Sequence, residues 1–133
     1  MPPFQSSPVY VSGARVLVVD DDRRTVNKIW HALLDCRVMT ETSVTSALRR
    51  LHAGERFDVL FCGLMMAEMS GAEFFLHVSR IDAEQAGRIV FLTGLGSLSD
   101  EFLAEHRALE QPFEAAEIRA VTANVVDDYA RSA

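Results

Sequence analysis

Four short apolar runs, separated by longer segments with a helical period, constrain the fold of this 133-residue chain more than any other feature. Such an alternation indicates βαβ units, whose strands lie parallel in one sheet. Ligands of open α/β sheets bind at the carboxyl ends of the strands, so the residues at these ends should lie close together. The run at 15–19 stops at the aspartates 20–22, and the run at 59–62 stops at Gly63. The run at 89–92 stops at Thr93, and the run at 108–109 leads to Gln111.

The whole pattern predicts five strands and five helices. A short additional strand is expected at 37–40, and apolar residues recur at the spacing of one helix face in each intervening segment. The strands at 58–62 and 89–93 are apolar on both faces, as expected for central strands that helices cover. Ser97 or Ser99 should cap a short fourth helix. Right-handed crossovers then favour a flavodoxin-like (βα)5 sandwich, an α/β fold with sheet order 2-1-3-4-5.

Composition indicates one globular, cytoplasmic domain. Apolar residues make up 49% of the chain, and the net charge of -6 argues against a nucleic-acid or anionic membrane partner. No apolar run approaches the roughly 18 residues that cross a bilayer. Cys36 and Cys62 do not form a disulfide framework, so both are expected to be reduced core thiols. We expect a flexible arm over residues 1–13 and a single domain over 14–131.

Five sequence blocks carry a family resemblance. They lie at 16–22, 57–60, 64–71, 91–94 and 109–113. In this order and spacing they resemble the receiver domain of bacterial two-component response regulators, over about residues 14–131. The resemblance implies a signalling module in a two-component or phosphorelay pathway. It also implies an acidic pair that holds Mg²⁺, an aspartate that a histidine kinase phosphorylates, a threonine and a lysine that contact the phosphoryl oxygens, and a cis peptide bond at Gln111-Pro112.

The chain matches the site of that family only in part. Asp20 and Asp21 fit the acidic pair, and Thr93 fits the hydroxyl position. The acceptor position falls on Gly63 and the lysine position on Gln111. Glycine offers no nucleophile for phosphoryl transfer, and two carboxylates are a thin ligand set for an ion that prefers six oxygens. We therefore expect a phosphorylation-independent receiver without enzymatic activity, with no required cofactor and at most weak Mg²⁺ binding at Asp20 and Asp21.

Several alternatives remain open at this point. Asp58 or Glu68 could replace the acceptor by an unusual route, although Asp58 lies about 16 Å upstream along an extended strand. The pair Asp20-x-Asp22 with Thr93 also echoes haloacid-dehalogenase-like phosphatases, which need a lysine and a later acidic pair that the chain lacks at the required places. The aspartates could merely cap the next helix, and the vacated pocket could bind a small ligand. The expected partner is a protein, namely a histidine kinase, a hybrid kinase or an output protein, and a homodimer is left open.

Overall fold

The structure is a computed structural model that describes residues 11–94 and 101–132. Its five strands are all parallel and follow the order β2-β1-β3-β4-β5, which confirms the flavodoxin-like arrangement. In chain order the elements are β1 (Arg15–Val19), α1 (Arg23–Ala32), β2 (Arg37–Glu41), α2 (Val44–His52), β3 (Val59–Gly63), α3 (Gly71–Ile81), α4 (Ala83–Gly87), β4 (Ile89–Thr93), α5 (Glu101–Ala104), β5 (Arg107–Glu110) and α6 (Ala115–Ser132).

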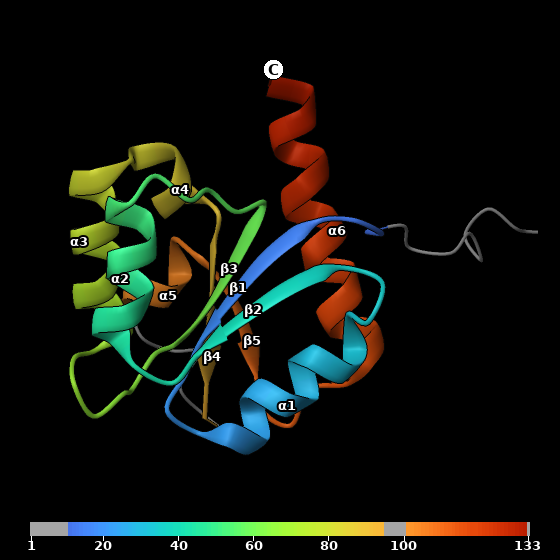
Figure 1. The fold of residues 1–133 in the computed structure, drawn as a ribbon. Helices are drawn as coiled ribbons and strands as arrows, with labels where there is room; N and C mark the ends of the chain where they lie inside the picture. The colour runs from blue at the N-terminus through green and yellow to red at the C-terminus, as the bar shows by residue number, and fades with distance from the viewer. Residues whose placement is uncertain (1–10, 95–100, 133) are drawn as a thin grey trace, which may run out of the picture.

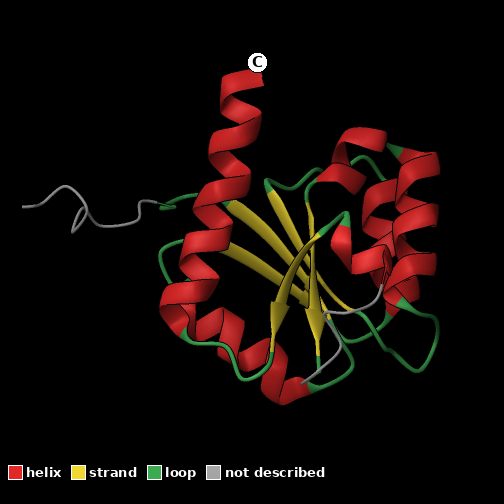
Figure 2. Cartoon of the chain, turned by 180° about the vertical axis from the view of Figure 1, so that it is seen from behind, coloured by secondary structure: helices red, strands yellow, loops and turns green. Residues whose placement is uncertain are grey.

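The sheet lies between two layers of helices. Figures 1 and 2 show α1 and α6 on one face and α2, α3, α4 and α5 on the other. Each face has its own apolar core, because alternate side chains of a strand point to opposite sides. Val16 and Val18 of β1 pack with the α1 and α6 side, whereas Leu17 and Val19 pack with the α2 and α3 side. β3 and β4 are buried along their whole length, as the sequence predicts for central strands.

A short helix, α4, was not expected from the sequence. Asp82 ends α3 and also begins α4, because its carboxylate accepts hydrogen bonds from the backbone N–H groups of Glu84 and Gln85. An acidic N-cap followed three residues later by glutamine is a recognisable helix start, so the sequence did carry a signal. The expected caps of the next helix, Ser97 and Ser99, lie outside the described residues.

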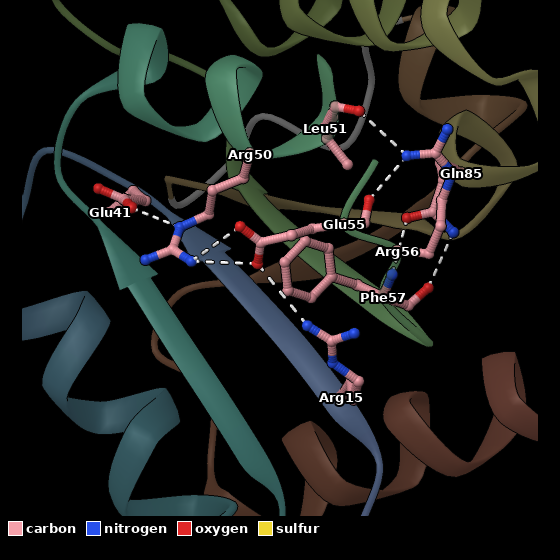
Figure 3. A network of polar contacts seen from close by, with 8 residues as sticks. All are labelled: Arg15, Glu41, Arg50, Leu51, Glu55, Arg56, Phe57 and Gln85. Carbon is pink, nitrogen blue, oxygen red and sulfur yellow. Dashed lines mark hydrogen bonds and ion pairs between the residues drawn. The ribbon is translucent and has the colours of Figure 1, made fainter. Parts of the chain in front are cut away.

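The helix α4 carries a buried glutamine that holds the chain entering β3. Gln85 is only 2% exposed. Its Oε1 accepts a hydrogen bond from the Phe57 backbone N–H at 2.9 Å, and its Nε2 donates to the Phe57 carbonyl, also at 2.9 Å (Figure 3). One side chain thus satisfies both backbone groups of a buried residue that has no strand partner at this point.

The N-terminal residues that the structure describes pack on the domain. Residues 1–10 of the expected arm lie outside the described residues. Val11 is buried, and its carbonyl accepts a hydrogen bond from the Cys36 thiol at 3.1 Å. Cys36 is half-buried and Cys62 is fully buried, and both are free thiols, as expected. Within the described part of the chain, no helix has the length and apolar character needed to span a membrane.

Candidate functional site

The strand register brings the predicted site residues to one edge of the sheet. Val19 of β1 lies opposite Cys62 of β3, so Asp20 is level with Gly63. Asp20, Asp21, Gly63 and Gln111 all line one open hollow of about 270 Å³. The whole lining consists of Asp20, Asp21, Asp22, Thr25, Gly63, Leu64, Met65, Leu92, Gly94 and Gln111.

Asp20 occupies the space where an acceptor side chain would begin. An added Cβ on Gly63 would lie 2.7 Å from Asp20 Oδ2 and 3.1 Å from Met66 Cγ, both closer than ordinary contacts. Asp20 is itself only 7% exposed, and its Oδ1 accepts a hydrogen bond from the Asp22 backbone N–H at 2.9 Å. The inward position of the Asp20 carboxylate is therefore possible only because Gly63 has no side chain.

The surroundings of Asp20 disfavour its charged form. Burial raises the pKa of this carboxyl above its ordinary value, the hydrogen bond from the Asp22 N–H opposes the rise, and the charges of Asp21 and Asp22 add to it. A raised pKa in the folded state means that this group supports folding at low pH. That support is lost as the pH rises through the folded-state value.

Replacing Asp20 with asparagine should therefore stabilise the metal-free protein at neutral pH. The amide keeps an acceptor for the Asp22 N–H and removes the penalty of a buried charge. The gain in melting temperature over the parent, measured in EDTA, should shrink as the pH falls toward 3.8, the ordinary pKa of the carboxyl. Asp127→Asn, at an exposed position on α6, is the matched control and should show no such trend. A destabilised Asp20→Asn variant at pH 7 would contradict this reading.

Two other carboxylates hold the loop between β3 and α3 in place. Asp21 Oδ2 accepts a hydrogen bond from the Ala67 backbone N–H at 2.7 Å. From the loop itself, Glu68 Oε1 accepts one from the Val44 N–H at 2.8 Å, and its Oε2 accepts one from the Thr45 hydroxyl at 3.3 Å. Glu68 thus caps the start of α2 and does not line the hollow at Gly63.

Asp58 lies at the opposite end of β3 from Gly63. Its Oδ2 accepts a hydrogen bond from the Arg15 backbone N–H at 2.8 Å, at the start of β1. The structure therefore brings neither Asp58 nor Glu68 to the predicted site. Each of these two carboxylates instead accepts a hydrogen bond from a local backbone N–H group.

The residue after β5 contributes the amide of Gln111 to this edge, and the end of β4 contributes the buried hydroxyl of Thr93. Gln111 Nε2 donates a weak hydrogen bond to the Thr25 hydroxyl at 3.5 Å, and the Gln111-Pro112 peptide bond is cis, as expected. Thr93 is 1% exposed, and its hydroxyl has no hydrogen-bond partner among the described residues. Thr25 was not among the residues predicted from the sequence, although its place in the first turn after the acidic triplet puts it at the same sheet edge.

The only lysine of the chain does not substitute for Gln111. Lys28 lines a neighbouring hollow of about 480 Å³ together with Asp22, Arg24 and Gln111. Its ammonium group lies 5.3 Å from the centre of the Phe113 ring, in a cation–π contact. Among the described residues, the hollow at Gly63 is thus lined by carboxylates, an amide, the Thr25 hydroxyl and apolar groups, without a lysine or arginine.

The residues at this edge fit a divalent cation poorly. Asp20 and Asp21 each use one oxygen to accept a backbone hydrogen bond, and the other Asp20 oxygen lies against Gly63. Within residues 11–94 and 101–132, no three His, Cys, Asp or Glu side chains are arranged to hold a metal ion. Because Mg²⁺ needs near-ideal octahedral oxygen geometry, these two carboxylates alone are a weak ligand set.

Gly71 supports the site from behind through a close backbone approach. It is the buried first residue of α3, and an added Cβ would lie 2.7 Å from the Gly63 carbonyl oxygen and 3.0 Å from Leu64 Cα. Its φ is not left-handed, since the described glycines with positive φ are Gly13 and Gly54. Close approach, and not a special turn conformation, therefore accounts for glycine here.

The variant Gly71→Ala should be destabilised by about 2 kcal/mol, the usual cost of overpacking against atoms that cannot yield. Backbone atoms of Gly63 and Leu64 would have to move, which would also shift the end of β3. Urea unfolding measures the change, with Ala72→Gly at the next helix position reporting the effect of helix propensity alone. An unfolding midpoint equal to that of the parent would show that the contact is not tight.

The fold and the match to a family model together identify a receiver-type signalling domain. The chain belongs to the response regulator receiver domain family, whose model matches residues 16–123. A receiver domain protein from Clostridium thermocellum is similar, with 25% identity, a TM-score of 0.78, and 90% of this chain and 99% of that chain covered.

Two further solved structures show the same fold. A CheY-like receiver domain protein from Methanospirillum hungatei has a TM-score of 0.79 at 17% identity, with 92% of this chain and 100% of that chain covered. NtrX from Brucella abortus, solved in complex with ADP, has a TM-score of 0.79 at 18% identity, with 90% of this chain and 28% of that chain covered. A comparison with curated proteins found no match.

Proposed function

We propose that this receiver domain transmits signals without phosphorylation, through contacts with a protein partner of a two-component or phosphorelay pathway. One observation carries the proposal. The position where the family resemblance places the acceptor is Gly63, and the Asp20 carboxylate lies where an acceptor side chain would begin. Phosphoryl transfer needs a nucleophile, and Gly63 has no side chain to supply one.

The charge balance of the site supports the same conclusion. The resemblance implies three carboxylates and one ammonium, which sum to a formal charge of -2 by simple subtraction. Asp20 and Asp21, with Gly63 and Gln111 at the other two positions, carry the same formal charge without the ammonium. A lysine without a carboxylate partner would be costly in a partly buried site. The absence of the lysine therefore fits the absence of the acceptor carboxylate.

The loop contacts add a second line of support. The Asp21–Ala67 and Glu68–Val44 hydrogen bonds fix the β3–α3 loop with groups that belong to the chain itself. The position of this loop then requires no phosphoryl group. We propose a non-enzymatic, cytoplasmic module that is held in one conformation and recognised in that conformation.

Intact-mass spectrometry after incubation with acetyl phosphate and Mg²⁺ tests the proposal. We expect no phosphoryl adduct, because Gly63 has no side chain that could accept the group and the nearest carboxylate, that of Asp20, is buried. A stoichiometric phosphoryl adduct on any residue would overturn the proposal. Peptide mapping would then identify the acceptor, with Asp58 and Glu68 as the first positions to examine.

We also expect Mg²⁺ to bind more weakly than about millimolar, because two partly engaged carboxylates make a poor octahedral site. Backbone NMR shifts of Asp20, Asp21 and Gly63 report on binding at this edge. Asp21→Asn should abolish whatever shift remains, and Asp127→Asn is the matched control. Saturation of these shifts at tens of micromolar Mg²⁺ would show that the ligand set is more complete than these contacts indicate.

A further inference from the structure

A second hollow lies at the other end of the molecule, between the carboxyl ends of α2 and α3. It measures about 460 Å³ and falls in the size range of small-molecule sites, roughly 300–1,000 Å³. It is remote from the Gly63 edge, because α2 begins beside Glu68 and ends at the hollow. The lining residues are Leu51, His52, Arg56, His77, Arg80 and Ile81.

The lining of this hollow is basic in a chain whose net charge is -6. Four of its six residues are arginine or histidine, and none is acidic. Basic residues near helix carboxyl ends are favoured by the helix dipole, which explains their presence on each helix separately. The dipole does not explain why the basic residues of α2, of α3 and of the loop after α2 line one shared hollow.

Arg56 is held in position as a preformed anchor. Its Nε donates to Asp82 Oδ2 at 2.8 Å, and its Nη1 donates to the carbonyls of Leu51 at 3.0 Å and Glu55 at 2.7 Å. Figure 3 shows the two carbonyl contacts of the guanidinium group. Its Nη2 has no partner among the described residues, which leaves the two N–H groups of this nitrogen for a ligand.

The other basic side chains of the hollow are exposed and have no polar partner among the described residues. Within the described part of the chain, His52, His77 and Arg80 make no ion pair and no side-chain hydrogen bond. Leu51 is buried and Ile81 half-buried, so they provide an apolar floor. Guanidinium groups bind carboxylates and phosphates through matched donors, and a preordered one loses little entropy on binding.

We propose that this hollow binds a small organic anion with a phosphate or carboxylate group. Arg56 is the fixed anchor, Arg80 supplies a second charge, and His52 and His77 supply further donors from the two helices. The apolar floor suits the carbon portion of such a ligand. The proposal is independent of the state of the Gly63 edge, because it uses none of those residues.

NMR titration of the full chain with inorganic phosphate, with succinate, and with sodium chloride at matched ionic strength tests the proposal. We expect saturable shifts of the backbone amides of His52, His77 and Arg80 with phosphate, with succinate or with both, and no saturation with chloride. Saturation by only one of the two probes assigns the ligand class. Non-saturating shifts that equal those in chloride, or saturation elsewhere on the surface, would overturn the proposal.

Variants of the exposed residues make the test specific without disturbing the fold. Arg80→Glu should weaken binding of the active probe at least about tenfold, the effect of losing one charged hydrogen bond. His77→Ala should weaken it less. Arg23→Glu, with the same charge change at an exposed position on α1, should bind as the parent does. Equal affinity of the Arg80→Glu variant and the parent would also overturn the proposal.

Discussion

Replacing Gln85 with alanine should lower the free energy of unfolding by about 4 kcal/mol. The glutamine is buried and satisfies both the N–H and the carbonyl of Phe57. Its removal leaves two buried backbone groups without partners, at about 1–3 kcal/mol each. Because whole domains are stable by only about 5–15 kcal/mol, this single change removes a large fraction of the stability.

Urea unfolding, followed by circular dichroism, measures this loss. Glu84→Ala is the matched control, because its side chain is exposed on the same short helix. We expect the control to lose well under about 1 kcal/mol, as surface substitutions usually do. A loss of less than about 1 kcal/mol for Gln85→Ala would show that water or a local shift readily replaces the two hydrogen bonds to Phe57.

Introducing a carboxylate at Gly63 should destabilise the protein in the absence of Mg²⁺ and make stability depend on the ion. The new Cβ would lie 2.7 Å from Asp20 Oδ2, so the Asp20 side chain must turn away, at about 1–3 kcal/mol. Gly63→Asp also places a third negative group beside Asp20 and Asp21, which raises repulsion. Mg²⁺ relieves that repulsion and gains a ligand, so it should raise the melting temperature of the variant and bind it more tightly than the parent.

The same variant should still accept phosphoryl groups poorly. Gln111 is neutral and cannot offset the charge that develops on the phosphoryl oxygens. Adding Gln111→Lys should therefore raise acetyl phosphate labelling by more than the two single changes together, as expected for coupled residues of one site. Ala116→Asp, an exposed carboxylate on α6, controls for added charge. Complete labelling of Gly63→Asp alone would show that the loss of the lysine is irrelevant.

The sheet and its edge were predictable because strand periodicity fixes which residues end together. The alternation of apolar runs and helical segments was sufficient to place Asp20, Gly63, Thr93 and Gln111 at one edge. In the structure each of them ends or follows a strand at that edge. Strand boundaries agree within one residue, as β3 spans Val59–Gly63 against the expected 58–62. Residue type and spacing carry this information, so no side-chain geometry was needed.

Contacts between side chains and distant backbone groups could not be predicted in this way. No pattern in the sequence indicates that Asp20 turns toward Gly63, or that Glu68 caps a helix 24 residues earlier in the chain. The pairing of Gln85 with Phe57 likewise spans 28 residues and depends on how α4 packs. These contacts arise only once the sheet and the helices are assembled, and they decide how the vacated edge is filled.

Comparison of three backbone NMR spectra tests the central claim most directly. They are taken of the parent protein alone, with Mg²⁺ alone, and with acetyl phosphate and Mg²⁺, and the Gly63→Asp, Gln111→Lys double variant is the responsive control. If this receiver domain is held in one conformation without a phosphoryl group, the parent spectra will coincide at Ala67, Glu68 and Thr93. A second set of resonances at these residues that appears with the phosphoryl donor, and not with Mg²⁺ alone, would contradict the account.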